Sequence, residues 1–294
     1  MLLATKDLLV NKVDQGILQG YSLRMKQGMS AGTVIVFGGS EGGCNYKKAE
    51  ELASQSFEVL ALFFFGKPNL PRELKQVPIE IFEAAHAYVT KHFANANEIT
   101  VLGESKGAEL ALVLGSEYSQ CIDKIVGIVP SSHVFYGLGT MEEEASSWTK
   151  NGQEIPYLSL ERVKKRWSIA TIRAFLHYIF RTLRKKPVSF RKIYELCIKL
   201  DENSEEARIK IENFSGELLL IAGGDDQLWH SDQMVKDIQA HRPVENTQAI
   251  VYPGVGHSIG GAVQTDQLIL GGTEALNRAA YEPMMERIIA FCQK

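Results

Sequence analysis

The stretch EITVLGESKGAELAL, residues 98–112, decides the fold expected for this chain. It begins with a short apolar run at 99–102, typical of a buried strand, and continues with apolar residues at helical spacing from Ala108. Between them lies Gly-x-Ser-x-Gly, residues 103–107, a motif of sharp strand-to-helix turns that expose a serine hydroxyl. The amides at the start of the helix favour negative charge nearby. Ser105 is therefore a candidate nucleophile, and a purely structural turn is the alternative.

Apolar runs and helical patterns alternate along most of the chain. Residues 6–25 alternate more weakly around Asp14-Gln15-Gly16 and predict an antiparallel hairpin at a sheet edge. The remaining pattern predicts an α/β fold with a mostly parallel central sheet and helices on both faces. Strands are expected at 33–37, 57–64, 99–102, 125–129, 218–222 and 248–252, and helices near 79–88, 108–114 and 275–291.

The composition narrows the class of protein. With a net charge of −3 and 45% hydrophobic residues, the chain does not suggest nucleic-acid binding. No apolar run reaches the ~18 residues of a membrane helix, and the N-terminus does not read as a secretory signal, so no stable membrane insertion is expected. The cysteines fit no metal-ligand spacing and predict unpaired thiols in a reducing cytoplasm. They are Cys44, Cys121, Cys197 and Cys292.

A serine nucleophile needs a base, and the base needs an orienting acid. In this architecture both partners follow strands, and the acid precedes the histidine. The relevant segments are GGDDQLW, 223–229, and PGVGH, 253–257. Asp226 and His257 are therefore the predicted acid and base. Asp225 is the alternative acid; Asp226 is preferred because the spacing Gly223-x-x-Asp226 gives the loop room to turn the carboxylate toward His257.

Two backbone amides are needed to bind an oxyanion. Lys106, directly after Ser105, is the first predicted donor. The second is expected in the loop GGSEGG, 38–43, where glycines let the backbone approach a carbonyl, with Gly39 placed ahead of Ser40. A phosphate-binding loop is the rival interpretation, but its Gly-Lys-Ser/Thr ending is missing. No cofactor or metal is predicted.

Taken together, these motifs resemble the C-terminal domain of the acyl-CoA thioesterase and bile acid-CoA:amino acid N-acyltransferase family, which has the α/β-hydrolase fold. The resembling segments, in family order, are FGGSEGG (37–43), LPREL (70–74), GESKGAEL (103–110), GGDDQLWHS (223–231) and YPGVGH (252–257). The resemblance implies a catalytic triad of Ser105, Asp226 and His257. The family's acyltransferases carry cysteine at the nucleophile and its thioesterases carry serine, so Ser105 implies hydrolysis.

Longer family members carry an N-terminal β-sandwich domain, and here only about thirty residues precede the first predicted core strand, so we expect that domain to be absent. The expected activity is that of a serine hydrolase acting on a small-molecule acyl thioester (acyl-CoA-like) or ester. A carboxylesterase that does not use CoA and a non-catalytic binding module of the same fold remain alternatives. The sequence leaves the oligomeric state open.

Residues 131–213 interrupt the alternation and predict a helical cap inserted into a single domain spanning 1–294. Within it, residues 162–194 carry many Lys and Arg and no Asp or Glu, and apolar residues recur at helical spacing from 169 to 183. Three interpretations remain open: a solvated helix packed on the core, contact with CoA phosphates, or transient docking on a membrane surface. The candidate phosphate contacts are Arg162, Lys164, Lys165 and Arg166.

Overall fold

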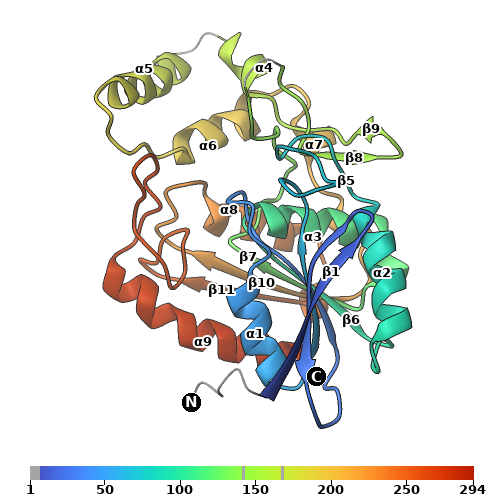
Figure 1. The fold of residues 1–294 in the computed structure, drawn as a ribbon. Helices are drawn as coiled ribbons and strands as arrows, with labels where there is room; N and C mark the ends of the chain where they lie inside the picture. Colours follow the sequence, from blue (N-terminus) through green and yellow to red (C-terminus); the bar gives the residue numbers. More distant parts are fainter. Residues whose placement is uncertain (1–6, 141–142, 167–168) are drawn as a thin grey trace.

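An eight-stranded sheet forms the centre of the computed structural model, which describes residues 7–140, 143–166 and 169–294 (Figure 1). The strand order is β1-β2-β4-β3-β6-β7-β10-β11. The strands are β1 (Leu8–Gln15), β2 (Leu18–Met25), β3 (Thr33–Phe37), β4 (Glu58–Phe63), β6 (Ile99–Glu104), β7 (Lys124–Ile128), β10 (Glu217–Gly223) and β11 (Thr247–Tyr252). β1 and β2 form the predicted edge hairpin, β2 pairs antiparallel with β4, and the other neighbours pair parallel. The predicted sheet is confirmed; Lys6, where the hairpin was expected to begin, lies outside the described residues.

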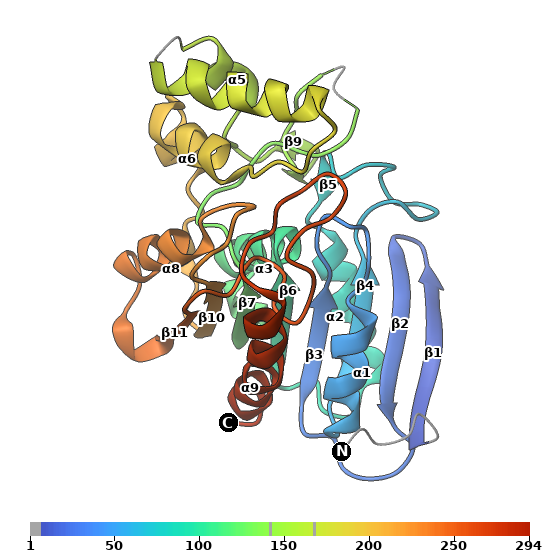
Figure 2. The same cartoon turned by 90° about the vertical axis from the view of Figure 1, so that its left-hand side faces the viewer.

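Helices cover both faces of this sheet (Figure 2). In β3, Ile35 and Phe37 join one hydrophobic cluster while Val34 and Val36 join the other, because successive side chains point to opposite faces. The first cluster is covered by α2, α3 and α8, and the second by α1 and α9. The helices are α1 (Tyr46–Ser54), α2 (Ile81–His92), α3 (Lys106–Glu117), α8 (Ser231–Ala240) and α9 (Glu274–Cys292), with short 3-10 turns η2 (Ser119–Cys121), η3 (Ile211–Asn213) and η4 (Val244–Asn246).

The register of the parallel strands brings their carboxyl ends to one edge. Phe37 of β3 lies opposite Gly103 of β6, and Glu104 lies opposite Ile128 of β7. On the other side, Gly223 of β10 lies opposite Tyr252 of β11. The loops that follow these strands therefore gather at the same edge, which is where ligands bind in open α/β sheets.

Between β7 and β10 the chain leaves the sheet and forms a cap at the end of the molecule opposite the C-terminus (Figure 1). Its elements are β8 (Trp148–Lys150), β9 (Gln153–Glu154), α4 (Leu160–Lys164), α5 (Ile169–Leu183), α6 (Arg191–Leu200) and α7 (Ser204–Ala207). The sequence predicts helices alone here, and this is wrong in one respect: β8 and β9 form a small sheet with β5 (Val77–Pro78). Strands of two or three residues are too short to give a periodic pattern.

Candidate active site

Ser105 occupies a strained turn between β6 and α3. Its φ of 55° and ψ of −118° lie where non-glycine residues are rarely found. The flanking glycines are needed for close packing: a Cβ on Gly103 would lie 2.0 Å from Gly107 O, and one on Gly107 would lie 2.1 Å from Gly38 O. The Ser105 amide donates to Ile128 O at 2.9 Å. The turn therefore holds the hydroxyl at the carboxyl edge of the sheet.

Three side chains from separate loops form a chain of hydrogen bonds. Ser105 Oγ lies 2.9 Å from His257 Nε2, and His257 Nδ1 lies 2.9 Å from Asp226 Oδ2. Asp226 is fully buried, and Ser105 and His257 are each 7% exposed. The structure thus brings together the three residues that the sequence singled out, in the order hydroxyl, imidazole, carboxylate.

The loop after β10 is built around the Asp226 carboxylate. Oδ1 accepts from the amides of Leu228 and Trp229 at 3.0 and 3.2 Å. Oδ2 accepts from Ser231 Oγ at 2.7 Å and faces His257. Asp225 turns elsewhere, accepting from the Gly272 amide at 2.9 Å. Sequence reasoning missed Ser231, since a serine that begins a helix carries no catalytic signal of its own.

The glycine-rich loop after β3 lies against the nucleophile. A Cβ built on Gly39 would lie 3.4 Å from Ser105 Cβ, whereas Ser40 has an exposed side chain. The Gly39 amide donates to Glu41 Oε1 at 3.0 Å. Of the two predicted positions for the second donor, Gly39 is therefore beside Ser105, and its amide is engaged by a carboxylate that the sequence analysis did not consider.

Trp229 packs against the candidate base. Its ring lies edge-on to His257 with 5.6 Å between centroids, and its Nε1 donates to Val129 O at 3.2 Å. Val129 directly follows β7 and has a φ of 44°, an outlier for a β-branched residue. The indole thus packs against the imidazole and is bonded to the strained residue that follows β7.

The ionisable groups near the triad, Glu104 and Cys44, have shifted pKa values. Burial would raise the pKa of Glu104, but Lys48 at 2.8 Å and Asn45 at 2.9 Å hold it below its ordinary value. Burial raises the pKa of Cys44, so this cysteine remains a thiol and a weak nucleophile. All four cysteines are unpaired, as predicted. Within the described residues, no group of three or more His, Cys, Asp or Glu side chains is placed to hold a metal.

The basic residues proposed for phosphate contact are largely engaged. Arg162 pairs with Asp201 at 2.8 Å, Lys164 with Glu161 at 2.6 Å, and Arg166 with Glu202 at 2.7 Å. These ion pairs are local to the cap. Of the three interpretations left open for the apolar residues of α5, packing on the core does not apply to Ile169 and Leu183, which are each 79% exposed.

The fold and the order of these groups define a member of the α/β-hydrolase class, in which a polarised serine hydroxyl faces the carboxyl edge of the sheet. Residues 77–294 match the family described as BAAT / Acyl-CoA thioester hydrolase C terminal, and the chain belongs to this family. None of the helices in the described ranges is long and apolar enough to cross a membrane.

Curated relatives carry acyl-CoA thioesterase names. The chain is 28% identical over 244 residues to the peroxisomal succinyl-coenzyme A thioesterase of Mus musculus, covering 79% of this chain and 50% of that protein. It is 31% identical over 240 residues to acyl-coenzyme A thioesterase 6 of Homo sapiens, with coverage of 79% and 50%. The chain thus spans about half the length of the curated relatives it matches.

Solved structures share the fold. An alpha/beta hydrolase, GrgF, from Penicillium sp. superposes with a TM-score of 0.57 at 11% identity, covering 97% of each chain. A putative dienelactone hydrolase from Klebsiella pneumoniae gives a TM-score of 0.55 at 11% identity, covering 95% of this chain and 97% of that one. At such low identity these likenesses establish the fold alone.

Proposed function

We propose that this chain is a serine hydrolase that cleaves an acyl thioester of the acyl-CoA type, or an ester, through an acyl-Ser105 intermediate. The observation that carries the proposal is the chain of 2.9 Å hydrogen bonds from Ser105 Oγ through His257 to the buried Asp226. Family membership and the names of the relatives support the acyl thioester as the substrate class.

In the first half-reaction, Ser105 Oγ attacks the acyl carbon while His257 Nε2 takes its proton. Asp226 accepts a hydrogen bond from Nδ1–H, which fixes the tautomer and stabilises the imidazolium. The carbonyl oxygen becomes an oxyanion, for which the amides of Lys106 and Gly39 are the proposed donors. Because the Gly39 amide is bonded to Glu41, that carboxylate must move before both donors can act.

The first half-reaction ends when the thiol leaves, and the second, hydrolysis of the acyl-Ser105 ester, returns the enzyme to its starting state. The tetrahedral intermediate collapses, the carbon–sulfur bond breaks, and His257 gives its proton to the departing thiolate. For an ester substrate, the carbon–oxygen bond breaks instead and an alcohol leaves. His257 then takes a proton from water, whose hydroxide attacks the acyl-Ser105 ester. When the second tetrahedral intermediate collapses, the bond between the acyl carbon and Ser105 Oγ breaks, His257 returns its proton to Ser105 Oγ, and the carboxylic acid leaves; no cofactor is required.

One observation favours the second candidate, a carboxylesterase that does not use CoA. Arg162, Lys164 and Arg166, the residues proposed to meet CoA phosphates, already pair with carboxylates in the cap. The carrier of the acyl group is therefore the property that an assay must decide.

We place the activity in the cytoplasm, an assignment supported by the unpaired cysteines.

The test measures thiol release from acyl-CoAs of several chain lengths beside hydrolysis of p-nitrophenyl esters. Ser105→Ala serves as the blank, His257→Gln tests the base, and Ser54→Ala on α1 is the matched serine control. We expect Ser105→Ala and His257→Gln to lose about 10³-fold or more of kcat, and Ser54→Ala to keep full activity. CoA release that depends on Ser105 selects the thioesterase, and ester cleavage without CoA release selects the carboxylesterase. Full activity in Ser105→Ala refutes the proposed nucleophile.

A further inference from the structure

The helix α5 presents an apolar face that nothing in the described structure covers. Leu176 is 60% exposed, and the side chains at both ends of the stripe are more exposed still. Half of the large hydrophobic side chains that are exposed in the described residues belong to this helix. They are Ile169, Ile172, Leu176, Ile179, Phe180 and Leu183.

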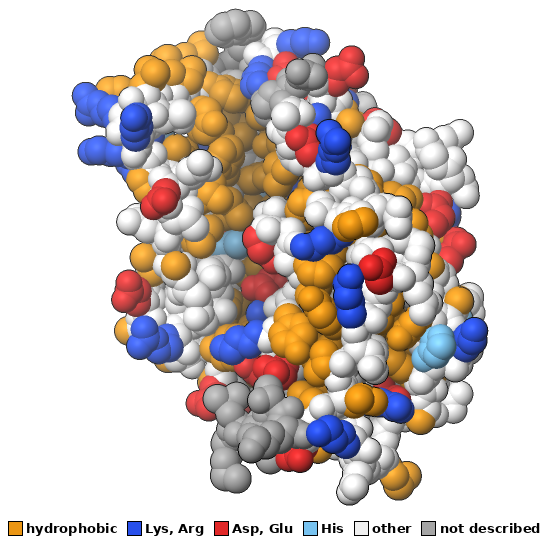
Figure 3. All heavy atoms as spheres, in the orientation of Figure 1, with side chains coloured by type: hydrophobic (Ala, Val, Ile, Leu, Met, Phe, Trp, Pro, Cys, Tyr) orange, Lys and Arg blue, Asp and Glu red, His pale blue; other side chains and the backbone are white. Residues whose placement is uncertain are grey.

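The opposite side of α5 already holds the helix in place. Thr171 is buried, and Ala174, Phe175 and Tyr178 pack against the hydrophobic cluster of the cap. The outward stripe is therefore a second apolar face, separate from the one that anchors α5. Figure 3 shows hydrophobic side chains gathered over α5 and in the hollow beneath it. A contiguous exposed patch of this kind marks an interaction surface.

Basic side chains border this stripe. Residues 162–194 hold 11 of the chain's 32 Lys and Arg and none of its 35 Asp and Glu. Arg173 on α5 and Arg184, directly after its last residue, lie along one edge of the stripe, and the Arg184 guanidinium lies 3.9 Å from the centroid of the Phe180 ring. Lys185 and Lys186 follow directly and are exposed. The positive charge is local, because the whole chain carries a net charge of −3.

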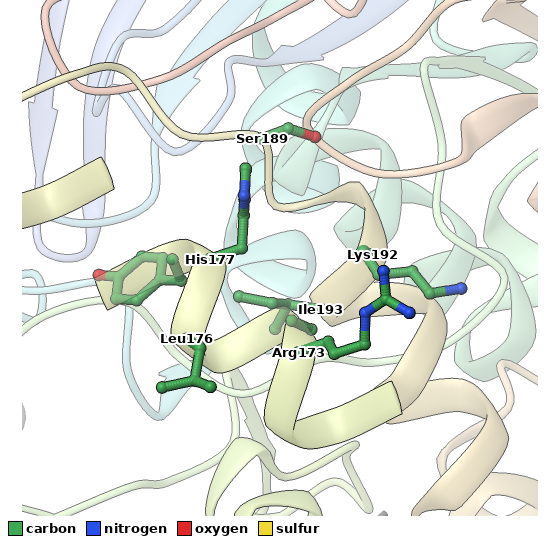
Figure 4. A pocket seen from close by; sticks show the side chains of 8 residues that line it. Arg173, Leu176, His177, Ser189, Lys192 and Ile193 are labelled. Carbon is green, nitrogen blue, oxygen red and sulfur yellow. The ribbon is translucent and has the colours of Figure 1, made fainter. Parts of the chain in front are cut away.

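An open groove of about 600 Å³ lies on the basic edge, between α5 and α6. Figure 4 shows Arg173 of α5 and Lys192 of α6 among its lining residues, with His177 and Ser189. Lys192 also pairs with Glu195 at 2.9 Å, so Arg173 is the principal cation available to a ligand there. An anionic phosphate group beside an apolar surface is the chemistry that this combination fits.

We propose that α5 docks the protein on the surface of an anionic phospholipid membrane. The apolar stripe would enter the boundary between headgroups and acyl chains, while Arg173, Arg184, Lys185 and Lys186 meet lipid phosphates. With 15 residues, α5 is only ~22 Å long, less than the ~30 Å of the hydrocarbon core, so it lies in the interface and does not span it.

A second copy of the chain fits this surface less well. Two-fold pairing would place the basic edges of two α5 helices against or beside one another without acidic partners from residues 162–194. An anionic lipid surface supplies the missing negative charge and the apolar environment together. Charge complementarity therefore favours the membrane.

The test uses the full chain in co-sedimentation with vesicles of phosphatidylcholine, with and without phosphatidylglycerol. We expect binding to the anionic vesicles only, and its loss in high salt. Leu176→Glu/Phe180→Glu should weaken binding at least about tenfold through loss of apolar insertion and added repulsion. Arg173→Gln/Arg184→Gln should weaken it about tenfold or more and reduce its salt dependence. Val244→Glu, a matched change at an 81% exposed position away from α5, should bind like the parent chain.

Hydrolysis of a soluble ester and the urea midpoint confirm that each variant is folded, since the altered side chains are exposed and lie outside the proposed catalytic groups. The proposal is overturned if the parent chain binds neither kind of vesicle, or if Leu176→Glu/Phe180→Glu binds as well as the parent. It is also overturned if the parent is a dimer in solution that this variant converts to a monomer. In that case the stripe is an interface between copies.

Discussion

At the scale of single residues, the candidate site depends on contacts between distant parts of the chain. Ser105 and His257 are 152 residues apart, and Asp226 and His257 are 31 apart. Their loops meet because each follows a parallel strand that ends at the same edge. The roles of neighbouring residues then depend on which way each side chain turns, and this distinguishes Asp226 from Asp225.

Asp226→Asn is expected to lower kcat by about 10³- to 10⁴-fold, because an amide in place of the carboxylate disfavours the tautomer of His257 that accepts the serine proton. Asp225→Asn is the matched control and should cost only a few-fold, since Asp225 bonds the Gly272 amide and not His257. Steady-state hydrolysis of an activated ester measures both. The reverse ranking would move the acid to Asp225.

Glu41→Ala is expected to raise kcat/KM by about 3- to 10-fold, because it frees the Gly39 amide from a hydrogen bond worth about 1 kcal/mol. Glu41→Gln keeps an acceptor without the charge, and its kcat/KM should lie between those of the parent chain and Glu41→Ala. The same ester assay measures the effect. A loss of activity in Glu41→Ala would mean that this carboxylate maintains the active shape of the loop.

At the scale of elements, the first turn of α3 is bonded to the cap. Lys106 Nζ, fully buried, lies 2.9 Å from Glu109 Oε1 and 2.8 Å from Ser147 Oγ. Glu109 Oε1 also accepts from Trp148 Nε1 at 2.9 Å. Burial lowers the pKa of Lys106 and raises that of Glu109, against the attraction between the two. The helix that follows the nucleophile is thereby fixed to the segment containing β8.

Removing one member of this pair leaves the other buried without its partner. Lys106→Met and Glu109→Gln should each lower the free energy of unfolding by about 3–5 kcal/mol, and the double variant by less than the sum. Lys192→Met and Glu195→Gln, at an exposed ion pair, should each lower the free energy of unfolding by under about 1 kcal/mol. Urea denaturation provides the values, and additive effects of the two buried substitutions would disprove the coupling.

At the scale of the whole molecule, the two ends of the cap meet where it leaves and rejoins the sheet. The amide of Val134 donates to Ala207 O at 2.9 Å, and that of Ile209 to Ser132 O at 3.0 Å. His133 is buried at this junction, with Nδ1 2.8 Å from Ser132 Oγ. Burial of the ring lowers the pKa of His133 to about 4. The nearby charge of Asp237 opposes this by raising the pKa, and Arg208 lowers it further by a smaller amount.

This shift predicts a dependence of stability on pH. The unfolded chain protonates His133 near its ordinary pKa of 6.5, while the folded protein resists until about pH 4. Burial of the neutral His133 ring therefore leaves the free energy of unfolding undiminished above pH 6.5. As the pH falls toward 4, protonation in the unfolded chain lowers that free energy by up to about 3 kcal/mol. His133→Gln should make the loss between pH 7 and 4.5 smaller, whereas the exposed His92→Gln should not. Urea midpoints at both pH values measure it, and equal slopes in the parent and His133→Gln would contradict the assignment.

The sequence by itself determined the central sheet, the helices α2, α3 and α9, and the three residues of the candidate triad, whereas α1 and α8 were not predicted. Continuous apolar runs follow from burial of a parallel strand on both faces, and helical patterns follow from burial of one helix face. The Gly-x-Ser-x-Gly turn has steric requirements that few other residues meet. The strands at 33–37 and 99–102, and the residues Ser105, Asp226 and His257, could be placed on this basis.

Only the tertiary structure decided which surfaces cover the predicted helices and which side chains bond to the residues of the candidate site. An apolar stripe reads the same whether it packs inward or faces out, so the periodicity of residues 169–183 gave no sign that much of α5 is exposed. Likewise, Glu41 on the Gly39 amide and Ser231 on the Asp226 carboxylate are contacts of polar groups with no periodic pattern. Spacing along the chain shows which side chains share a face, whereas what covers that face and which hydrogen-bond partners form depend on how segments pack in three dimensions.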